Sequence, residues 1–260
     1  MIYIAFLFFT FLVLAFAFYQ WQHFMIFSPT YHRDSDLGSE CEILSLTTDD
    51  GVELEGVVYE PKKFTNTILF FAGRSHDAVG LIKKLSFNYP NVRIITFNYR
   101  SYGRSGGTIS EKNILSDALF IAQIIQKNYG DFYVFGYSLG SNIASYVASK
   151  KSSLGVFLVG SFDSIASIAK EKFVNRGSFP MMNLSSIFRY KLRTREYVEN
   201  IDAKVYIFVS KSDETTYIQN ARNLKNHVKN LAYYEELDNL SHKELLWDSK
   251  VIDTINGVLK

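Results

Sequence analysis

A serine between two glycines is the clearest chemical signal in the sequence. Gly136, Ser138 and Gly140 form a Gly-x-Ser-x-Gly motif directly after the strand-forming run FYVFG and before a run of helical composition. A strand, a sharp turn and a helix are the setting that exposes such a serine for nucleophilic attack. The glycines allow the strand and the helix to approach closely. The backbone N–H of Leu139 is then expected to face a developing oxyanion. The alternative is a glycine-rich turn whose serine has no chemical role.

A serine hydroxyl needs a base that a third group orients. In enzymes with this kind of turn, the partners follow in the order serine, acid, histidine. Only two histidines, His227 and His242, follow Ser138. His227 lies in the helical stretch 216–229, which predicts a surface position, whereas His242 lies in a loop after the strand-forming run LAYYEEL. We therefore expect His242 to be the base. The other histidines of the chain are His23, His32 and His76.

The acid is expected in a loop at the end of a strand. Asp213 directly follows the strand-forming run VYIFVS, in the loop KSDET, and Glu214 is its neighbour. Asp238 is only four residues before His242, which is too near for an acid contributed by the preceding strand end. Charged residues in loops are usually exposed, so a solvated surface position is the alternative for both candidates. Asp213 is the favoured acid and Glu214 remains the alternative.

The surrounding pattern predicts an α/β fold that would bring these loops together. Residues 41–48 and 52–60 alternate around Asp49-Asp50-Gly51, which indicates a β-hairpin. Short apolar runs follow, as in strands of a parallel sheet that is covered on both faces. They are residues 67–73, 92–98, 132–136, 154–160 and 205–210. Helical stretches separate them, the clearest over 111–128, where apolar residues recur at helical spacing. A mostly parallel, doubly wound sheet with an antiparallel hairpin binds ligands beyond the carboxyl ends of its strands.

The N-terminus predicts a membrane anchor. Residues 2–18 carry no charge, and extending this run to Trp21 gives 20 residues, the length needed to cross a hydrocarbon core of ~30 Å. A cleaved signal peptide is the alternative, because Ala15-Phe16-Ala17 resembles a cleavage site, but the basic segment that should precede it is missing. We expect an anchor over 1–21, a connecting segment over 22–40 and a folded domain over 41–260. The stretch FMIF (24–27) is expected to dock on that domain.

An insertion over about 161–203 is long enough for a small lid of short helices. Its apolar residues could line an acyl pocket or form the core of the lid itself: Met181, Met182, Leu184, Ile187 and Phe188. A basic run follows, which either is a solvated face or meets anionic headgroups of a membrane. It consists of Arg189, Lys191, Arg193 and Arg195.

Composition excludes several classes of protein. A formal net charge of +2 gives no argument for nucleic-acid binding. The single cysteine, Cys41, excludes an internal disulfide. The sequence shows no phosphate-binding loop, dinucleotide fingerprint or metal-ligand spacing. No cofactor, metal ion or nucleic-acid partner is therefore expected.

Three stretches resemble a known family. FMIFSPT after the apolar segment, FNYRSYGRSGG (97–107) and FGYSLGS (135–141) are similar to the corresponding motifs of membrane-anchored α/β-hydrolase-domain serine hydrolases, a group often placed with the serine aminopeptidase-like hydrolases. The resemblance implies an α/β-hydrolase fold with Ser138 as nucleophile, Asp213 as acid and His242 as base. It also implies a catalytic domain on the side of the membrane away from the cytoplasm. The positive-inside rule adds little, because few charges flank the apolar segment.

One departure from the family concerns the loop that completes the oxyanion hole. Where the family has a histidine followed by glycine, this chain has Ala72 and Gly73 in the stretch FFAGRSHD. The donor is a backbone amide, so the N–H of Arg74 is still expected to serve. What supports the loop without the imidazole is open. So is the role of the Arg74 side chain, which could narrow the pocket, pair with an anionic substrate or remain at the surface.

These features predict a serine hydrolase that needs no cofactor. An esterase, thioesterase, lipase-like enzyme or peptidase would form an acyl-enzyme on Ser138 from a small-molecule or lipid-like acyl substrate. An aminopeptidase would need an acidic group for the substrate amine, and the sequence does not locate one. The alternative is a non-catalytic membrane scaffold that keeps the fold, and the altered loop around Arg74 is its best support.

Overall fold

The computed structural model describes residues 2–31, 37–174 and 188–260. An eight-stranded sheet forms the centre, in the order β1-β2-β4-β3-β5-β6-β7-β8. The strands are β1 (Cys41–Thr47), β2 (Glu53–Tyr59), β3 (Asn66–Phe71), β4 (Val92–Phe97), β5 (Tyr133–Tyr137), β6 (Val156–Val159), β7 (Val205–Ser210) and β8 (Leu231–Leu237). β2 is antiparallel to β1 and to β4, and the pairs from β4 to β8 are parallel. The predicted α/β fold with an antiparallel hairpin is confirmed.

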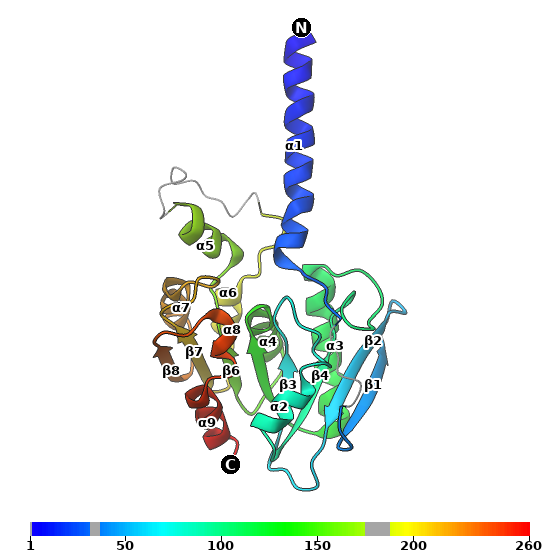
Figure 1. Cartoon of the computed structure of the whole chain (residues 1–260), viewed down its shortest axis with the longest axis vertical. Coiled ribbons are helices and arrows are strands. Elements are labelled where there is room, and N and C mark those ends of the chain that lie inside the picture. The colour runs from blue at the N-terminus through cyan, green and yellow to red at the C-terminus, as the bar shows by residue number, and fades with distance from the viewer. Residues whose placement is uncertain (1, 32–36, 175–187) are drawn as a thin grey trace.

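Helices cover both faces of this sheet (Figure 1). The helices of the domain are α2 (Ile82–Asn88), α3 (Glu111–Tyr129), α4 (Leu139–Lys150), α5 (Ile165–Ala169), α6 (Thr194–Val198), α7 (Ile218–Lys225), α8 (His242–Leu245) and α9 (Ser249–Val258). Successive side chains of a strand point to opposite faces, so β3 divides its apolar residues between two core clusters. Leu69 packs in the cluster that includes α3 and α4, while Phe70 packs in the cluster that includes α2 and α9.

The helix predicted over 111–128 is present as α3. Its buried residues recur at helical spacing, which explains why this face packs on the sheet. They include Ile114, Ala118, Ile121, Ala122 and Ile125. The Ser110 side chain accepts a hydrogen bond from the Asn113 N–H and so caps the first turn. Gly130, with φ of 85°, ends the helix in a conformation that favours glycine.

The N-terminal helix α1 (Ile2–Ile26) projects from the domain (Figure 1). An 18-residue window within it has a mean hydropathy of 2.4 and is 0% buried, so the helix is long and apolar enough to cross a membrane. It continues five residues beyond the predicted end at Trp21, because neither glycine nor proline occurs before Pro29. Within the FMIF stretch, which was expected to dock on the domain, Phe27 is 1% exposed, whereas Phe24 is 69% exposed.

The described part of the predicted lid consists of short helices. α5 leads into a π-helical turn, η1 (Lys170–Val174), and α6 follows the gap in the described residues. Four of the predicted pocket residues lie outside the described residues, namely Met181, Met182, Leu184 and Ile187. Phe188 is described and lines a cavity. In the basic run, the Arg189 guanidinium lies over the Tyr19 ring of α1, whereas Arg193 forms an exposed ion pair with Glu196.

Candidate active site

Ser138 occupies the sharp turn between β5 and α4. Its φ of 54° and ψ of −118° are strained for a residue with a side chain, and its N–H donates to the Val159 carbonyl at 2.9 Å. The two glycines of the motif allow this turn. A Cβ atom on Gly140 would lie 1.9 Å from the Phe71 carbonyl oxygen, and one on Gly136 would lie 2.2 Å from the Gly140 oxygen. Helix α4 can therefore begin directly behind β5 only with glycine at both positions.

The three residues expected to act together lie in one hydrogen-bonded chain. The His242 Nε2 atom is 2.8 Å from the Ser138 Oγ atom, and the His242 Nδ1 atom is 2.6 Å from the Asp213 Oδ2 atom. A carboxylate accepts a hydrogen bond from the Nδ1–H of a neutral imidazole, which leaves Nε2 without a proton and able to accept the proton of the serine hydroxyl. This arrangement can generate a nucleophilic serine at neutral pH.

The environment of Asp213 keeps its carboxylate ionised. Burial raises the pKa of Asp213, but hydrogen bonds from His242 and Thr216 outweigh it and hold the pKa below its ordinary value. The carboxylate also accepts from the Thr215 N–H at 2.7 Å. A carboxyl group whose pKa falls on folding stabilises the fold above its ordinary pKa, and this contribution is lost as the pH falls through the lowered value. Asp213 therefore carries a negative charge beside His242 at neutral pH.

The structure gives the other candidate partners different contacts, although Glu214 also lines a cavity next to Ser138. Glu214 is exposed beside buried Asp213, and Asp238 forms an ion pair with Lys211. The helix predicted over 216–229 is shorter than expected, because α7 ends at Lys225. His227 therefore lies after the helix, where its Nδ1 atom is 2.9 Å from a carboxylate oxygen of Glu199. Of the remaining histidines, His23 bonds to the Tyr190 hydroxyl, the His76 ring contacts the Tyr137 ring, and His32 lies outside the described residues.

Three contacts fix the position of His242 at the start of α8. Ser241 and Glu244 form a capping box, which begins the helix at this residue. The Tyr137 hydroxyl donates to the His242 carbonyl at 2.8 Å. The Tyr137 ring also stacks on the imidazole, with 5.3 Å between ring centres. Tyr137, the residue before Ser138, therefore orients the expected base, a contact that the sequence did not reveal.

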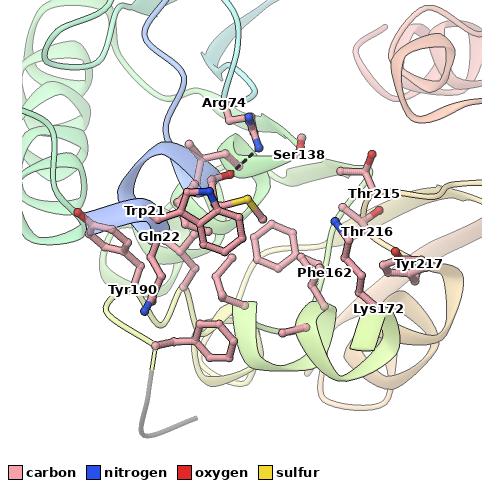
Figure 2. Close-up of a pocket in the computed structure, with 18 of the residues that line it drawn as sticks. Trp21, Gln22, Arg74, Ser138, Phe162, Lys172, Tyr190, Thr215, Thr216 and Tyr217 are labelled. Atoms are coloured by element: carbon pink, nitrogen blue, oxygen red, sulfur yellow. Dashed lines mark hydrogen bonds between the residues drawn. The ribbon is translucent and has the colours of Figure 1, made fainter. Parts of the chain in front are cut away.

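Tyrosine hydroxyls support the loop that carries Arg74. The Ala72 carbonyl accepts from the Tyr99 hydroxyl at 2.7 Å, and the Arg74 carbonyl accepts from the Tyr102 hydroxyl. Both tyrosines belong to the FNYRSYGRSGG stretch. The Arg74 guanidinium donates from Nη1 to the Met25 carbonyl at the end of α1, which is the dashed line in Figure 2. The side chain thus connects the loop to the N-terminal helix, a role that the sequence did not suggest.

A cavity of about 810 Å³ lies next to Ser138. Leu139 and Arg74 line it beside the serine, and most of its other residues are apolar (Figure 2). Its size is in the range of sites for small organic molecules. Part of the wall comes from α1, through Phe18, Trp21, Gln22, Met25 and Ile26. Sequence reasoning missed this set, although the spacing of 3, 1, 3 and 1 residues places it on one helical face.

No metal site is evident in the part of the chain that the structure describes. Within these residues, no group of three or more histidine, cysteine, aspartate or glutamate side chains could hold an ion.

Comparison with known proteins relates the chain to a large fold family. A family model described as "alpha/beta hydrolase fold" matches residues 70–185. An uncharacterised protein of Acanthamoeba polyphaga mimivirus is 28% identical over 71% of this chain and 69% of its own length. An uncharacterised membrane protein of Saccharomyces cerevisiae is 30% identical over 50% of this chain, which spans 49% of that protein. Lysophosphatidylserine lipase ABHD12 of Danio rerio is 43% identical over 54 residues, or 20% of this chain and 14% of the lipase.

Solved structures share the fold at low sequence identity. An esterase of Pyrococcus furiosus superposes with a TM-score of 0.66 and 16% identity, over 90% of this chain and 96% of the esterase. An alpha-beta hydrolase of Vibrio vulnificus superposes with a TM-score of 0.67 and 17% identity, over 84% and 81% of the two chains. At this identity the likeness concerns the fold alone.

Proposed function

We propose that this chain, which has an α/β-hydrolase fold, is a serine hydrolase that cleaves a lipid-like acyl ester through an acyl-enzyme on Ser138. The observation that carries the proposal is the hydrogen-bonded chain of Ser138, His242 and Asp213 beside a large apolar cavity. Thioester and amide bonds react by the same route and remain within the proposal.

The geometry supports a two-step reaction. His242 Nε2 accepts the hydroxyl proton as Ser138 Oγ attacks the carbonyl carbon, and Asp213 stabilises the resulting imidazolium. Backbone N–H groups of Leu139 and Arg74 are proposed to stabilise the oxyanion, the former at the N-terminus of α4. The imidazolium then protonates the departing alcohol, which leaves an acyl group on Ser138. In the second step His242 accepts a proton from water as the water oxygen attacks the acyl carbon. The bond to Ser138 Oγ then breaks, the imidazolium returns the proton to that oxygen, and the acid is released.

The cavity favours a substrate with an acyl chain. Its lining is mostly apolar and reaches from Ser138 to the N-terminal helix. The similarity to a lysophosphatidylserine lipase, although limited to 54 residues, is consistent with a lipid-like substrate. The scaffold alternative was based on the altered loop at Ala72 and Arg74. Because Tyr99 and Tyr102 hold that loop, its sequence no longer favours the alternative.

We also propose that α1 anchors the enzyme in a membrane and that the catalytic domain faces away from the cytoplasm. The length and composition of α1 support the anchor. The orientation depends on the family resemblance alone. Fusions of the C-terminus to two reporters, one active only in the cytoplasm and one active only outside it, should give a signal from the second. A signal from the cytoplasmic reporter would contradict the orientation.

A fluorophosphonate probe tests the proposed nucleophile directly. We expect the full-length protein in detergent to be labelled covalently, because the probe traps a serine that an adjacent base activates. Ser138→Ala should abolish labelling. Ser149→Ala is a matched control, since that serine also lies on α4 but bonds to the Tyr146 carbonyl. An unlabelled wild-type protein would favour the scaffold, and labelling that survives Ser138→Ala would place the nucleophile elsewhere.

A further inference from the structure

The C-terminal end of α1 turns one face toward the cavity. Phe18, Trp21, Gln22, Met25 and Ile26 line it. From the first to the last of these residues the helix rises about 12 Å, at 1.5 Å per residue. A helix that served only as a tether would have no reason to present one continuous face to a cavity beside the nucleophile. This face of α1 is therefore placed to contact a bound substrate as well as the membrane.

Specific contacts hold this part of α1 against the domain. Gln22 is only 5% exposed, and its Oε1 atom accepts from the Arg189 N–H at 2.7 Å. The His23 Nδ1 atom lies 2.8 Å from the Tyr190 hydroxyl. The Arg74 guanidinium binds the Met25 carbonyl. Because these contacts come from two separate segments of the domain, the helix face keeps a fixed position relative to Ser138.

The same face lies where the bilayer is expected to end. The stretch that can span the hydrocarbon core reaches Trp21, so the cavity begins within it, at Phe18. Arg189 donates to the Gln20 Oε1 atom at 3.3 Å and lies over the Tyr19 ring at 4.6 Å. A cation and an aromatic ring at one level are typical of the membrane interface. The apolar cavity thus borders the acyl-chain region of the bilayer.

We infer that the end of α1 is a wall of the acyl-binding site, and that Met25 determines which acyl chains of a membrane-resident ester fit. The inference rests on the proposed function. Met25 is singled out because its carbonyl is bound to Arg74, which lines the cavity beside Ser138. Trp21 and Phe18 follow one and two turns further from this point, so a longer chain would contact them in turn.

Adding bulk at Met25 tests the inference, with Phe24 as the matched control. Met25 lines the cavity, whereas its neighbour Phe24 is 69% exposed. Full-length protein in vesicles of ether-linked phosphatidylcholine, which has no ester bond, would be assayed with p-nitrophenyl esters from acetate to palmitate. Met25→Trp should lower kcat/KM for palmitate relative to acetate by about tenfold, because the larger side chain would occupy space that a long acyl chain needs. Phe24→Trp should leave the chain-length profile unchanged.

Met25→Ala makes the opposite change in the volume of the cavity. It keeps the inference testable even if Met25→Trp fails to fold. The shorter side chain enlarges the cavity, so kcat/KM for the longest esters should rise relative to acetate. Identical profiles for wild type, Met25→Trp and Met25→Ala would overturn the inference and leave the proposed function standing. The inference would also be overturned if Met25→Trp lowered kcat/KM equally at all chain lengths while Met25→Ala kept the chain-length profile of wild type. A wild-type protein that hydrolyses no ester at any chain length would overturn the proposed function and this inference together.

Discussion

Ser138→Ala and His242→Ala are each expected to lower kcat for ester hydrolysis by about 10⁴- to 10⁶-fold. The first variant lacks the oxygen that attacks the substrate, and the second lacks the base 2.8 Å from it. The double variant should be hardly slower than either single variant, because the two residues act as one unit. The measurement is the initial rate of hydrolysis of a p-nitrophenyl ester by the purified full-length protein, corrected for spontaneous hydrolysis.

His76→Ala is the matched control for the base. The rings of His76 and His242 both contact Tyr137, but the structure places only His242 against the serine hydroxyl. Burial lowers the pKa of His76, so this histidine is neutral at neutral pH. His76→Ala should retain most of the activity. If it loses activity while His242→Ala keeps it, the assignment of the base is wrong.

Asp213→Asn is expected to lower kcat by about 10⁴-fold. The neutral amide cannot stabilise the imidazolium, and an amide N–H directed at His242 would favour the wrong tautomer of the ring. Because the pKa of Asp213 lies below its ordinary value, wild-type Asp213 is ionised at neutral pH, and the loss should therefore persist there. The measurement is kcat at neutral pH for both proteins, with a thermal unfolding midpoint to show that the variant is folded.

Glu214→Gln is the control for the acid. The two carboxylates are neighbours in the chain, but Asp213 is buried against His242 whereas Glu214 is exposed. We expect Glu214→Gln to keep kcat within a few-fold of wild type. A severe loss in Glu214→Gln, together with normal activity in Asp213→Asn, would transfer the role of the acid to Glu214.

The sequence by itself determined the order of the strands along the chain and the local setting of the serine. Hairpin, strands and α3 follow from short-range patterns, namely the turn residues, the apolar runs and the helical spacing of buried side chains. Gly136 and Gly140 indicated that the strand and the helix approach closely at Ser138, because only a residue without a Cβ atom fits at these two positions. The order serine, acid, histidine along the chain, together with the loop position of His242, was enough to predict that His242 lies beside Ser138.

Tertiary structure alone decided which of two adjacent carboxylates faces His242. Side chains of neighbouring residues point in different directions, so the sequence favoured Asp213 but could not exclude Glu214. It also could not show that hydroxyls of Tyr99 and Tyr102 hold the loop where the family has a histidine. The contribution of α1 to the cavity was hidden for a similar reason. An apolar helix is equally suited to a membrane and to a cavity wall, and only contacts between distant segments, such as Arg74 with Met25, show that it packs against the domain and lines the cavity next to Ser138.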